Sequence, residues 1–139
     1  MITTFRLGLL QNKAFRNLKQ WTSRMLAPYS LSSSDWAILG LLFENKEGMR
    51  ILELAKEMGV EPPFVTVLID SLEVKKLVIC ELDKKDKRAK TARLTKKGFE
   101  LVPEIEKILK KGSQDLLKGV SKLELLAYFR VLQAIVRNQ

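Results

Sequence analysis

The residues most able to do chemistry in this chain are lysines and arginines gathered between Leu77 and Gly98. Between Glu81 and Lys97 the sequence holds eight basic residues and three acidic ones. A segment this polar cannot be buried, so it projects into water or onto an anion. Clustered cations suit the phosphates of a nucleic-acid backbone. A solvated surface that keeps the protein soluble is the alternative, and the neighbouring elements decide between the two.

Few other chemistries are open to the chain. It has 139 residues, no histidine and one cysteine, Cys80. These counts largely remove soft-metal sites and histidine-based catalysis, and neither a phosphate-binding glycine loop nor a paired acidic motif is present. We therefore expect a protein that is not an enzyme and that needs no metal and no cofactor. Cys80 lies in an aliphatic run and is expected to be a buried, inert thiol.

Charge is unevenly spread along the chain. The net charge of +9 divides into +5 for residues 1–34, −5 for 35–74, +7 for 75–98 and +2 for 99–139. A basic stripe of this kind predicts attraction to nucleic acid or to an anionic surface. No apolar run is long enough to span a bilayer, and the lone cysteine fits a reducing compartment. We expect a cytoplasmic protein that is associated with the nucleoid through DNA binding.

Short apolar segments flank the basic cluster. Residues 77–80 (LVIC) and 91–94 (TARL) suit β-strands and predict a β-hairpin with cations at its tip. A short helix over 51–58, ended by Gly59, and a helix over 62–75, opened by two prolines, precede this hairpin. Two helices joined by a tight glycine turn and followed by a basic hairpin form a winged helix-turn-helix.

Longer helices flank this core. The apolar periodicity predicts helices over about residues 3–25, after Ser32, after Thr95 and after Ser121. The second of them opens with a capping box in which Asp35 replaces the usual Glu or Gln. The first and last helices each carry an apolar face that needs a partner surface in so small a domain. Binding of the first helix to a membrane surface is the less favoured explanation for its face.

Several stretches together resemble the MarR family of bacterial transcriptional regulators. Residues 54–60 (LAKEMGV) and 65–73 (VTVLIDSLE) are similar to the family's helix-turn-helix. The pattern DxxDxR at 83–88, followed by LTxxG at 94–98, is similar to its wing signature. The resemblance covers nearly the whole chain and implies a mainly α fold with a small β-hairpin wing. The implied organisation is a single MarR-like domain over 1–139, with the winged helix-turn-helix core at 31–98 and dimerisation helices at 1–30 and 99–139.

The resemblance also implies a homodimeric DNA-binding transcriptional regulator, with ligand-responsive repression as the expected role. The helix over 62–75 would enter the major groove of a pseudo-palindromic operator, and the wing over 83–90 would reach the adjacent minor groove. Arg88 would be the wing-tip arginine, braced by Asp86, because a narrow minor groove attracts a flexible cation. The implied DNA-contacting residues are Pro63, Phe64, Thr66, Val67, Lys84, Lys85, Asp86, Lys87, Arg88 and Lys90. For each lysine, a solvated surface charge is the alternative.

Three aromatic residues are candidates for an effector pocket. Trp21, Trp36 and Phe43 could line a cleft between the first two long helices and the helix that follows the wing. The resemblance places effector pockets there, often for aromatic acids or phenols. Core packing explains the same three residues without any ligand.

The helix over 62–75 departs from the family pattern. Family members often carry arginines at the positions held here by Val67 and Ser71, whereas this helix has no basic residue before Lys75. Bidentate readout of guanine by arginine is therefore not available from its middle. We expect modest sequence discrimination or recognition of DNA shape. The alternative function is a winged-helix dimer that serves as a protein-interaction module with weak or non-specific DNA binding.

Overall fold

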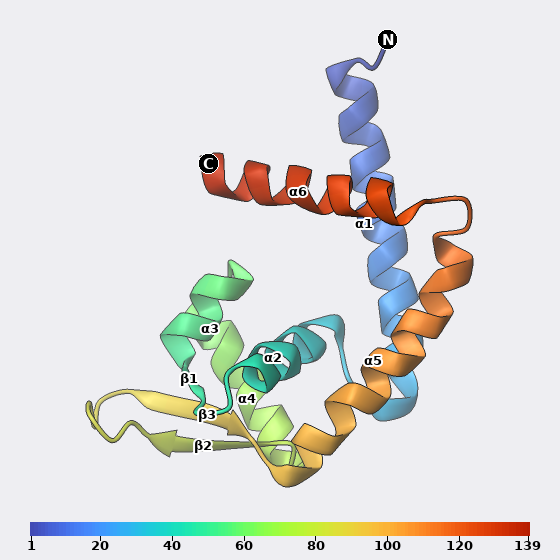
Figure 1. The fold of residues 1–139 in the computed structure, drawn as a ribbon. Helices are drawn as coiled ribbons and strands as arrows, with labels where there is room; N and C mark the ends of the chain where they lie inside the picture. Colours follow the sequence, from blue (N-terminus) through green and yellow to red (C-terminus); the bar gives the residue numbers. More distant parts are fainter. The chain divides into compact units, whose positions relative to one another are not determined.

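The computed structural model describes all 139 residues, as six α-helices, one 3-10 turn and a three-stranded sheet (Figure 1). The expected mainly α fold with a hairpin wing is confirmed. Contacts divide the chain into two units, Met1–Ile108 and Leu109–Gln139. In chain order the elements are α1 (Thr4–Leu26), η1 (Ala27–Tyr29), α2 (Ser33–Glu44), β1 (Met49–Arg50), α3 (Ile51–Met58), α4 (Pro62–Val74), β2 (Val78–Leu82), β3 (Lys90–Leu94), α5 (Lys96–Leu116) and α6 (Lys122–Asn138).

The sheet contains a strand that the sequence pattern did not reveal. Its order is β1-β3-β2, and both pairings are antiparallel. The strand β1 is only two residues long and pairs Arg50 with Thr91 of β3. A segment this short shows no alternation, so only its tertiary partner identifies it. This pairing places Arg50, the residue that precedes α3, beside Thr91 at the base of the wing.

Helix starts follow the capping chemistry of the sequence. At α2, the Ser32 backbone N–H donates to Asp35 Oδ2 over 2.8 Å, and the Asp35 N–H donates to Ser32 Oγ over 3.0 Å. The expected capping box is therefore present. Ser121 and Glu124 form the same reciprocal pair at the start of α6. At the end of α3, Gly59 has a φ of 65°, the left-handed conformation that stops a helix.

The α2 cap yields a first prediction. Replacing Ser32 with alanine leaves the Asp35 N–H without its side-chain acceptor, and we expect a loss of about 1 kcal/mol in the free energy of unfolding. Urea denaturation followed by circular dichroism measures this change. Ser33→Ala is the matched control, because the Ser33 side chain makes no hydrogen bond and the substitution should change stability little. Equal losses in the two variants would argue against the cap.

The core of unit 1 fixes which face of α4 is free. Buried apolar side chains come from α2, α3, the sheet and the first turns of α5. On α4 the buried residues are Val65, Ile69 and Leu72, each at most 1% exposed. They lie three and four residues apart and form one stripe. The opposite side of α4 therefore faces out of the unit.

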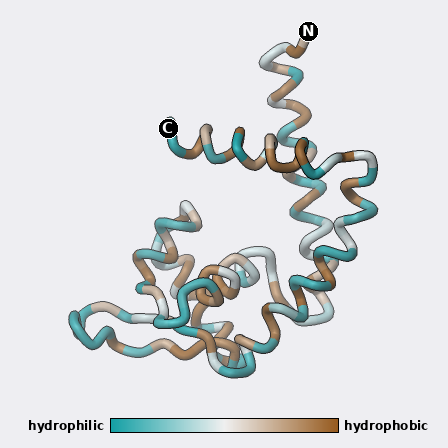
Figure 2. The backbone as a smooth tube through the Cα atoms, in the orientation of Figure 1, coloured by the Kyte–Doolittle hydropathy of each residue, from teal (hydrophilic) through white to brown (hydrophobic).

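The terminal helices bury very little. In α1 only Leu26 is buried, and in α6 no residue is. Both nevertheless carry large exposed apolar side chains, and in Figure 2 the tube of these helices alternates between brown, hydrophobic residues and teal, hydrophilic ones. The exposed ones are Phe5, Leu7, Leu9, Leu10, Phe15 and Leu18 in α1, and Leu123, Leu125, Leu126, Tyr128, Phe129, Val131, Ile135 and Val136 in α6. None of the helices is both long enough and apolar enough to traverse a bilayer.

Candidate nucleic-acid interface

The wing is the hairpin formed by β2 and β3 together with the loop 83–89 that joins them. The loop lies at the far end of the sheet from the α4–β2 junction, and Figure 2 shows it as a mainly hydrophilic segment. Five basic side chains stand there exposed, and none forms an ion pair or a side-chain hydrogen bond. They are Lys84, Lys85, Lys87, Arg88 and Lys90. The structure thus leaves a group of free cations at the tip, as the sequence predicted.

Asp83 organises the loop behind these cations. Its Oδ1 accepts the backbone N–H groups of Lys85 and Asp86 over 2.8 and 3.0 Å. Its Oδ2 accepts Arg50 Nε over 3.1 Å and Thr91 Oγ1 over 3.0 Å. The two oxygens thereby join the loop, β3 and the start of α3. One carboxylate therefore ties the wing tip to the helix-turn-helix.

The electrostatics of this carboxylate follow from its donors. The backbone N–H of Asp86 and the guanidinium of Arg50 hold the pKa of Asp83 well below its ordinary 3.8. The Asp83 carboxylate in turn raises the pKa of Arg50. Asp83 is therefore charged throughout the neutral range. An aspartate that follows a strand and precedes polar residues is the sequence signal for this kind of turn.

Asp86 shapes the tip without pairing with the Arg88 side chain. Its Oδ1 accepts the backbone N–H of Arg88 over 3.0 Å, and its backbone carbonyl accepts the N–H of Ala89 over 3.0 Å. The guanidinium of Arg88 has no protein partner. The brace expected between Asp86 and Arg88 thus acts on the backbone, and it leaves the cation free for an external anion.

The outward face of α4 is apolar at its start. Phe64 is 45% exposed and Val67 is 67% exposed. Pro63 is exposed beside them, while the Thr66 hydroxyl donates back to the Pro62 carbonyl over 3.3 Å. All the predicted α4 contact residues are therefore at the surface. The first basic residue, Lys75, follows the helix and donates its Nζ to the Ser30 carbonyl.

Polar contacts hold α4 and the wing together. The Glu73 carboxylate accepts the backbone N–H of Cys80 over 3.4 Å, and Lys97 Nζ donates to the Lys75 carbonyl over 3.2 Å. Thr95 Oγ1 donates to the Lys76 carbonyl over 2.7 Å and accepts the N–H of Gly98 over 3.1 Å. These bonds link the end of α4, the hairpin and the start of α5.

Cys80 lies at this junction and is half-buried, so the expected full burial was wrong. Its side chain lies on the same face of β2 as that of the buried Val78, two residues earlier, but nearer the loop 83–89. Burial, followed by the nearby Glu73 carboxylate, raises the pKa of the thiol, and Lys90 opposes this in part. The thiolate is therefore disfavoured, and the inertness of this thiol stays a prediction.

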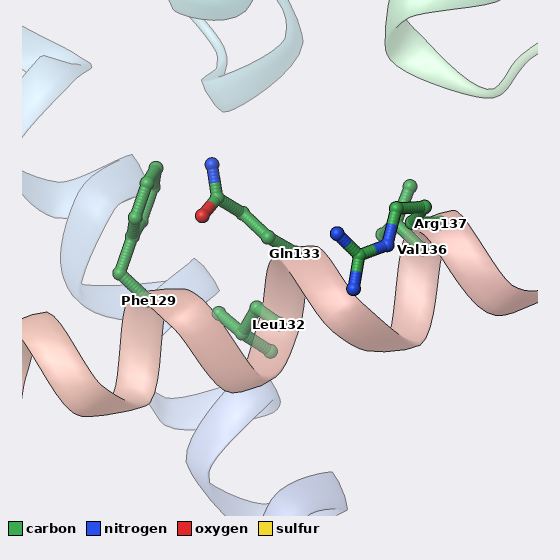
Figure 3. A pocket seen from close by; sticks show the side chains of 5 residues that line it. All are labelled: Phe129, Leu132, Gln133, Val136 and Arg137. Atoms are coloured by element: carbon green, nitrogen blue, oxygen red, sulfur yellow. The ribbon is translucent and has the colours of Figure 1, made fainter.

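The three aromatic pocket candidates are half-buried in unit 1. Phe43 packs against Phe99 with ring centroids 4.8 Å apart, and Lys46 Nζ lies 5.4 Å from the Phe99 centroid. A groove of about 670 Å³ at the wing base and one of about 540 Å³ on α6 are lined by other residues. The α6 groove is lined by Phe129, Leu132, Gln133, Val136 and Arg137, all on one helix (Figure 3). No group of three or more Cys, Asp or Glu side chains is arranged to hold a metal ion.

Comparison with known proteins agrees with this architecture. Residues 31–90 match the model of the MarR family. A MarR-family transcriptional regulator from Rhodococcus sp. RHA1 is similar over 100% of this chain and 98% of its own, with a TM-score of 0.89 and 22% identity. CouR from Rhodococcus jostii RHA1, solved with p-coumaroyl-CoA, gives a TM-score of 0.85 and 23% identity over 93% of this chain and 90% of its own. MepR from S. aureus, solved with DNA, gives a TM-score of 0.82 and 24% identity over 100% of this chain and 100% of its own. The family match spans the helix-turn-helix and the whole wing loop, and the similarity to the solved MarR-family structures extends the same fold over the rest of the chain.

Proposed function

We propose that this chain is a transcriptional regulator that binds duplex DNA as a homodimer. In this proposal α4 lies in the major groove and the wing, residues 83–90, lies in the adjacent minor groove. The observation that carries it is the wing tip, where free cations stand on a loop ordered by Asp83. A loop that is already ordered loses little conformational entropy when it binds. The similar MepR was solved in complex with DNA, which supports the same partner here.

Each part of the surface has a distinct role in the proposal. Arg88 occupies the minor groove, where a narrow groove concentrates negative potential. The wing lysines Lys84, Lys85, Lys87 and Lys90 contact phosphates, and each contact adds roughly one unit to the dependence of log affinity on log salt. Asp86 holds the backbone of Arg88. Pro63, Phe64, Thr66 and Val67 face the bases.

The apolar faces of α1 and α6 support the homodimer. Surfaces of this kind are seldom left in water, because each large apolar side chain gains roughly 1.5–3 kcal/mol on burial. We assign residues 1–30 and 99–139 to dimerisation and 31–98 to the DNA-binding core of one domain. A two-fold dimer places two α4 helices about one helical turn of DNA apart, so the operator is a pseudo-palindrome.

Repression released by a small ligand completes the proposal. The similar CouR was solved with p-coumaroyl-CoA, a phenolic thioester, and an aromatic or phenolic effector suits the half-buried Trp21, Trp36 and Phe43 of this chain. A ligand that prefers a spacing of the two α4 helices unable to fit both grooves would release the DNA. Isothermal titration with p-coumaroyl-CoA and with free phenolic acids tests this step. If a Trp36→Ala variant binds every compound as tightly as the wild type does, Trp36 does not line the effector pocket.

The second prediction concerns Arg88. We expect Arg88→Ala to weaken binding to the bound site roughly 10- to 100-fold and to lower the salt slope by about one unit. Fluorescence anisotropy with the DNA upstream of the protein's own gene, at about 50 and about 200 mM salt, measures both quantities. Arg88→Lys keeps the charge but lacks the planar guanidinium, so it should keep the slope and still lose affinity.

A charge control separates the wing from the general positive field. Lys118 is exposed in the turn between α5 and α6, and Lys118→Ala removes the same charge without touching the wing. We expect it to bind DNA as the wild type does. Equal losses for Lys118→Ala and Arg88→Ala would contradict the proposed position of the wing.

One observation favours the second candidate function, a protein-interaction module. The outward face of α4 is apolar and acidic, with Phe64, Val67 and Asp70 exposed and no cation. Feeble duplex binding that is flat in salt and unaffected by Arg88→Ala would favour the module. Salt-sensitive, site-specific binding that is lost in Arg88→Ala favours the regulator.

A further inference from the structure

The exposed side chains at the start of α4 lack the hydrogen-bond donors that a guanine-reading surface needs. Guanine offers two acceptors, O6 and N7, in the major groove, and arginine or lysine donors read them. In the first two turns of α4 the outward side chains are Pro63, Phe64, Thr66 and Val67. Three of these have no polar atom, and the fourth has its hydroxyl bonded to the Pro62 carbonyl. The surface offers hydrocarbon where a guanine reader would carry donors.

The rest of the helix adds no donor fork. Asp70 is exposed and, when charged, only accepts hydrogen bonds, so it repels the acceptor edge of guanine. Ser71 has a single hydroxyl and cannot make a bidentate contact. The nearest cation, Lys75, is committed to the Ser30 carbonyl. Bidentate guanine recognition from α4 therefore has no side chain to perform it.

Thymine is the base that presents an apolar group in the major groove, its C5-methyl. We infer that α4 reads its half-site through thymine methyls, with Val67 and Phe64 as the specificity-determining residues. This inference rests on the proposed function. Val67 lies opposite the buried stripe and is 67% exposed, and Phe64 is 45% exposed beside it. The N-terminal turns of a recognition helix are the part that contacts base edges.

The wing favours DNA of the same base composition, rich in A·T pairs. Runs of A·T pairs narrow the minor groove and attract an inserted arginine, and the free Arg88 guanidinium is placed at the wing tip for it. Methyl contacts by α4 and minor-groove insertion by the wing thus favour one kind of site. The specified sequence is a thymine-containing half-site in the major groove, flanked by a narrow A·T-rich minor groove.

Replacement of thymine by uracil tests the inference, because it deletes the C5-methyl and keeps base pairing. The bound site is first obtained from upstream DNA or by selection from a random duplex pool. We expect each contacted thymine changed to uracil to weaken binding about fourfold, the equivalent of one buried methyl group at about 0.8 kcal/mol. Replacing guanines by 7-deazaguanine, which lacks the N7 acceptor, should leave affinity unchanged.

A matched pair of valine variants ties the effect to α4. Val67→Ala should bind the thymine duplex about fourfold more weakly and should lose its sensitivity to uracil at one position. Val74 is 83% exposed at the end of the same helix, and Val74→Ala should retain full sensitivity. Intact binding with no response to uracil, or a strong loss with 7-deazaguanine, would overturn the methyl readout and leave the regulator standing. Absence of any salt-sensitive duplex binding would overturn both.

Discussion

Replacing Asp83 with asparagine is expected to weaken DNA binding about tenfold. Asparagine has one acceptor oxygen and cannot serve all four donors that Asp83 now satisfies, from Lys85, Asp86, Arg50 and Thr91. Its amide NH₂ would also face a donor. The loop then samples other conformations, and a wing that is competent for a tenth of the time raises the apparent dissociation constant about tenfold.

Asp86→Asn is the control for this experiment, since it makes the same change three residues further along. Asp86 accepts one N–H through its side chain, that of Arg88, and an asparagine oxygen can replace it there. We expect a loss of no more than about threefold. Anisotropy titrations of both variants at one salt concentration, with hydrogen exchange of loop 83–89, give the comparison. Faster exchange confined to Asp83→Asn supports the organising role, and identical behaviour of the two variants contradicts it.

The pH dependence of stability provides a separate check on Asp83. Because its pKa is lower in the folded than in the unfolded chain, its charged form stabilises the fold at every pH above the unfolded value of about 3.8. That stabilisation is lost as the pH falls below about 4 toward the folded-state pKa. We expect the difference in unfolding free energy between the wild type and Asp83→Asn to be constant from pH 7 to pH 5 and to shrink below pH 4. A difference that grows with acidification would contradict this assignment.

Much of the fold was predictable because its signals are local. The Ser32 and Ser121 caps, the Gly59 stop and the proline-opened α4 each act within one turn of chain, so a few adjacent residues suffice to read them. The hairpin was predicted too short, at 77–80 and 91–94, whereas β2 reaches Leu82 and β3 begins at Lys90. The strand ends carry charged residues, which do not favour strands, so the pairing of Glu81 with Thr91 and of Leu82 with Lys90 was not predicted.

The features that were missed depend on residues far apart in sequence. The strand β1 exists only because β3 lies beside it, and Asp83 acquires its role from Arg50, 33 residues earlier. Likewise the ring partner of Phe43 is Phe99, which lies on α5 and far along the chain. The basic tip of the wing was readable from composition alone. The carboxylate that orders it was not, because acid and base must be brought together by the fold before either has a partner.

The largest expected effect on stability comes from Gly98, at the start of α5. Gly98 is buried, and a Cβ added there would overlap the Leu77 carbonyl oxygen, a backbone atom that cannot rotate away. That same oxygen accepts the N–H of Thr95 over 3.0 Å, so moving it breaks the junction of β2 with α5. The glycine of the LTxxG pattern is therefore a packing requirement, and the threonine is its cap.

We expect Gly98→Ala to lower the free energy of unfolding by roughly 2–3 kcal/mol, the cost of overpacking a close contact. Gly8 is the matched control, since it lies inside α1 and a Cβ there would meet nothing within 4 Å. Gly8→Ala should instead raise stability by about 0.5–1 kcal/mol, because alanine is the better helix former. Urea unfolding at one fixed protein concentration compares the two variants. Opposite signs would show that Leu77 and Gly98 touch as described, whereas a gain in both would mean that the start of α5 lies away from the β2 strand.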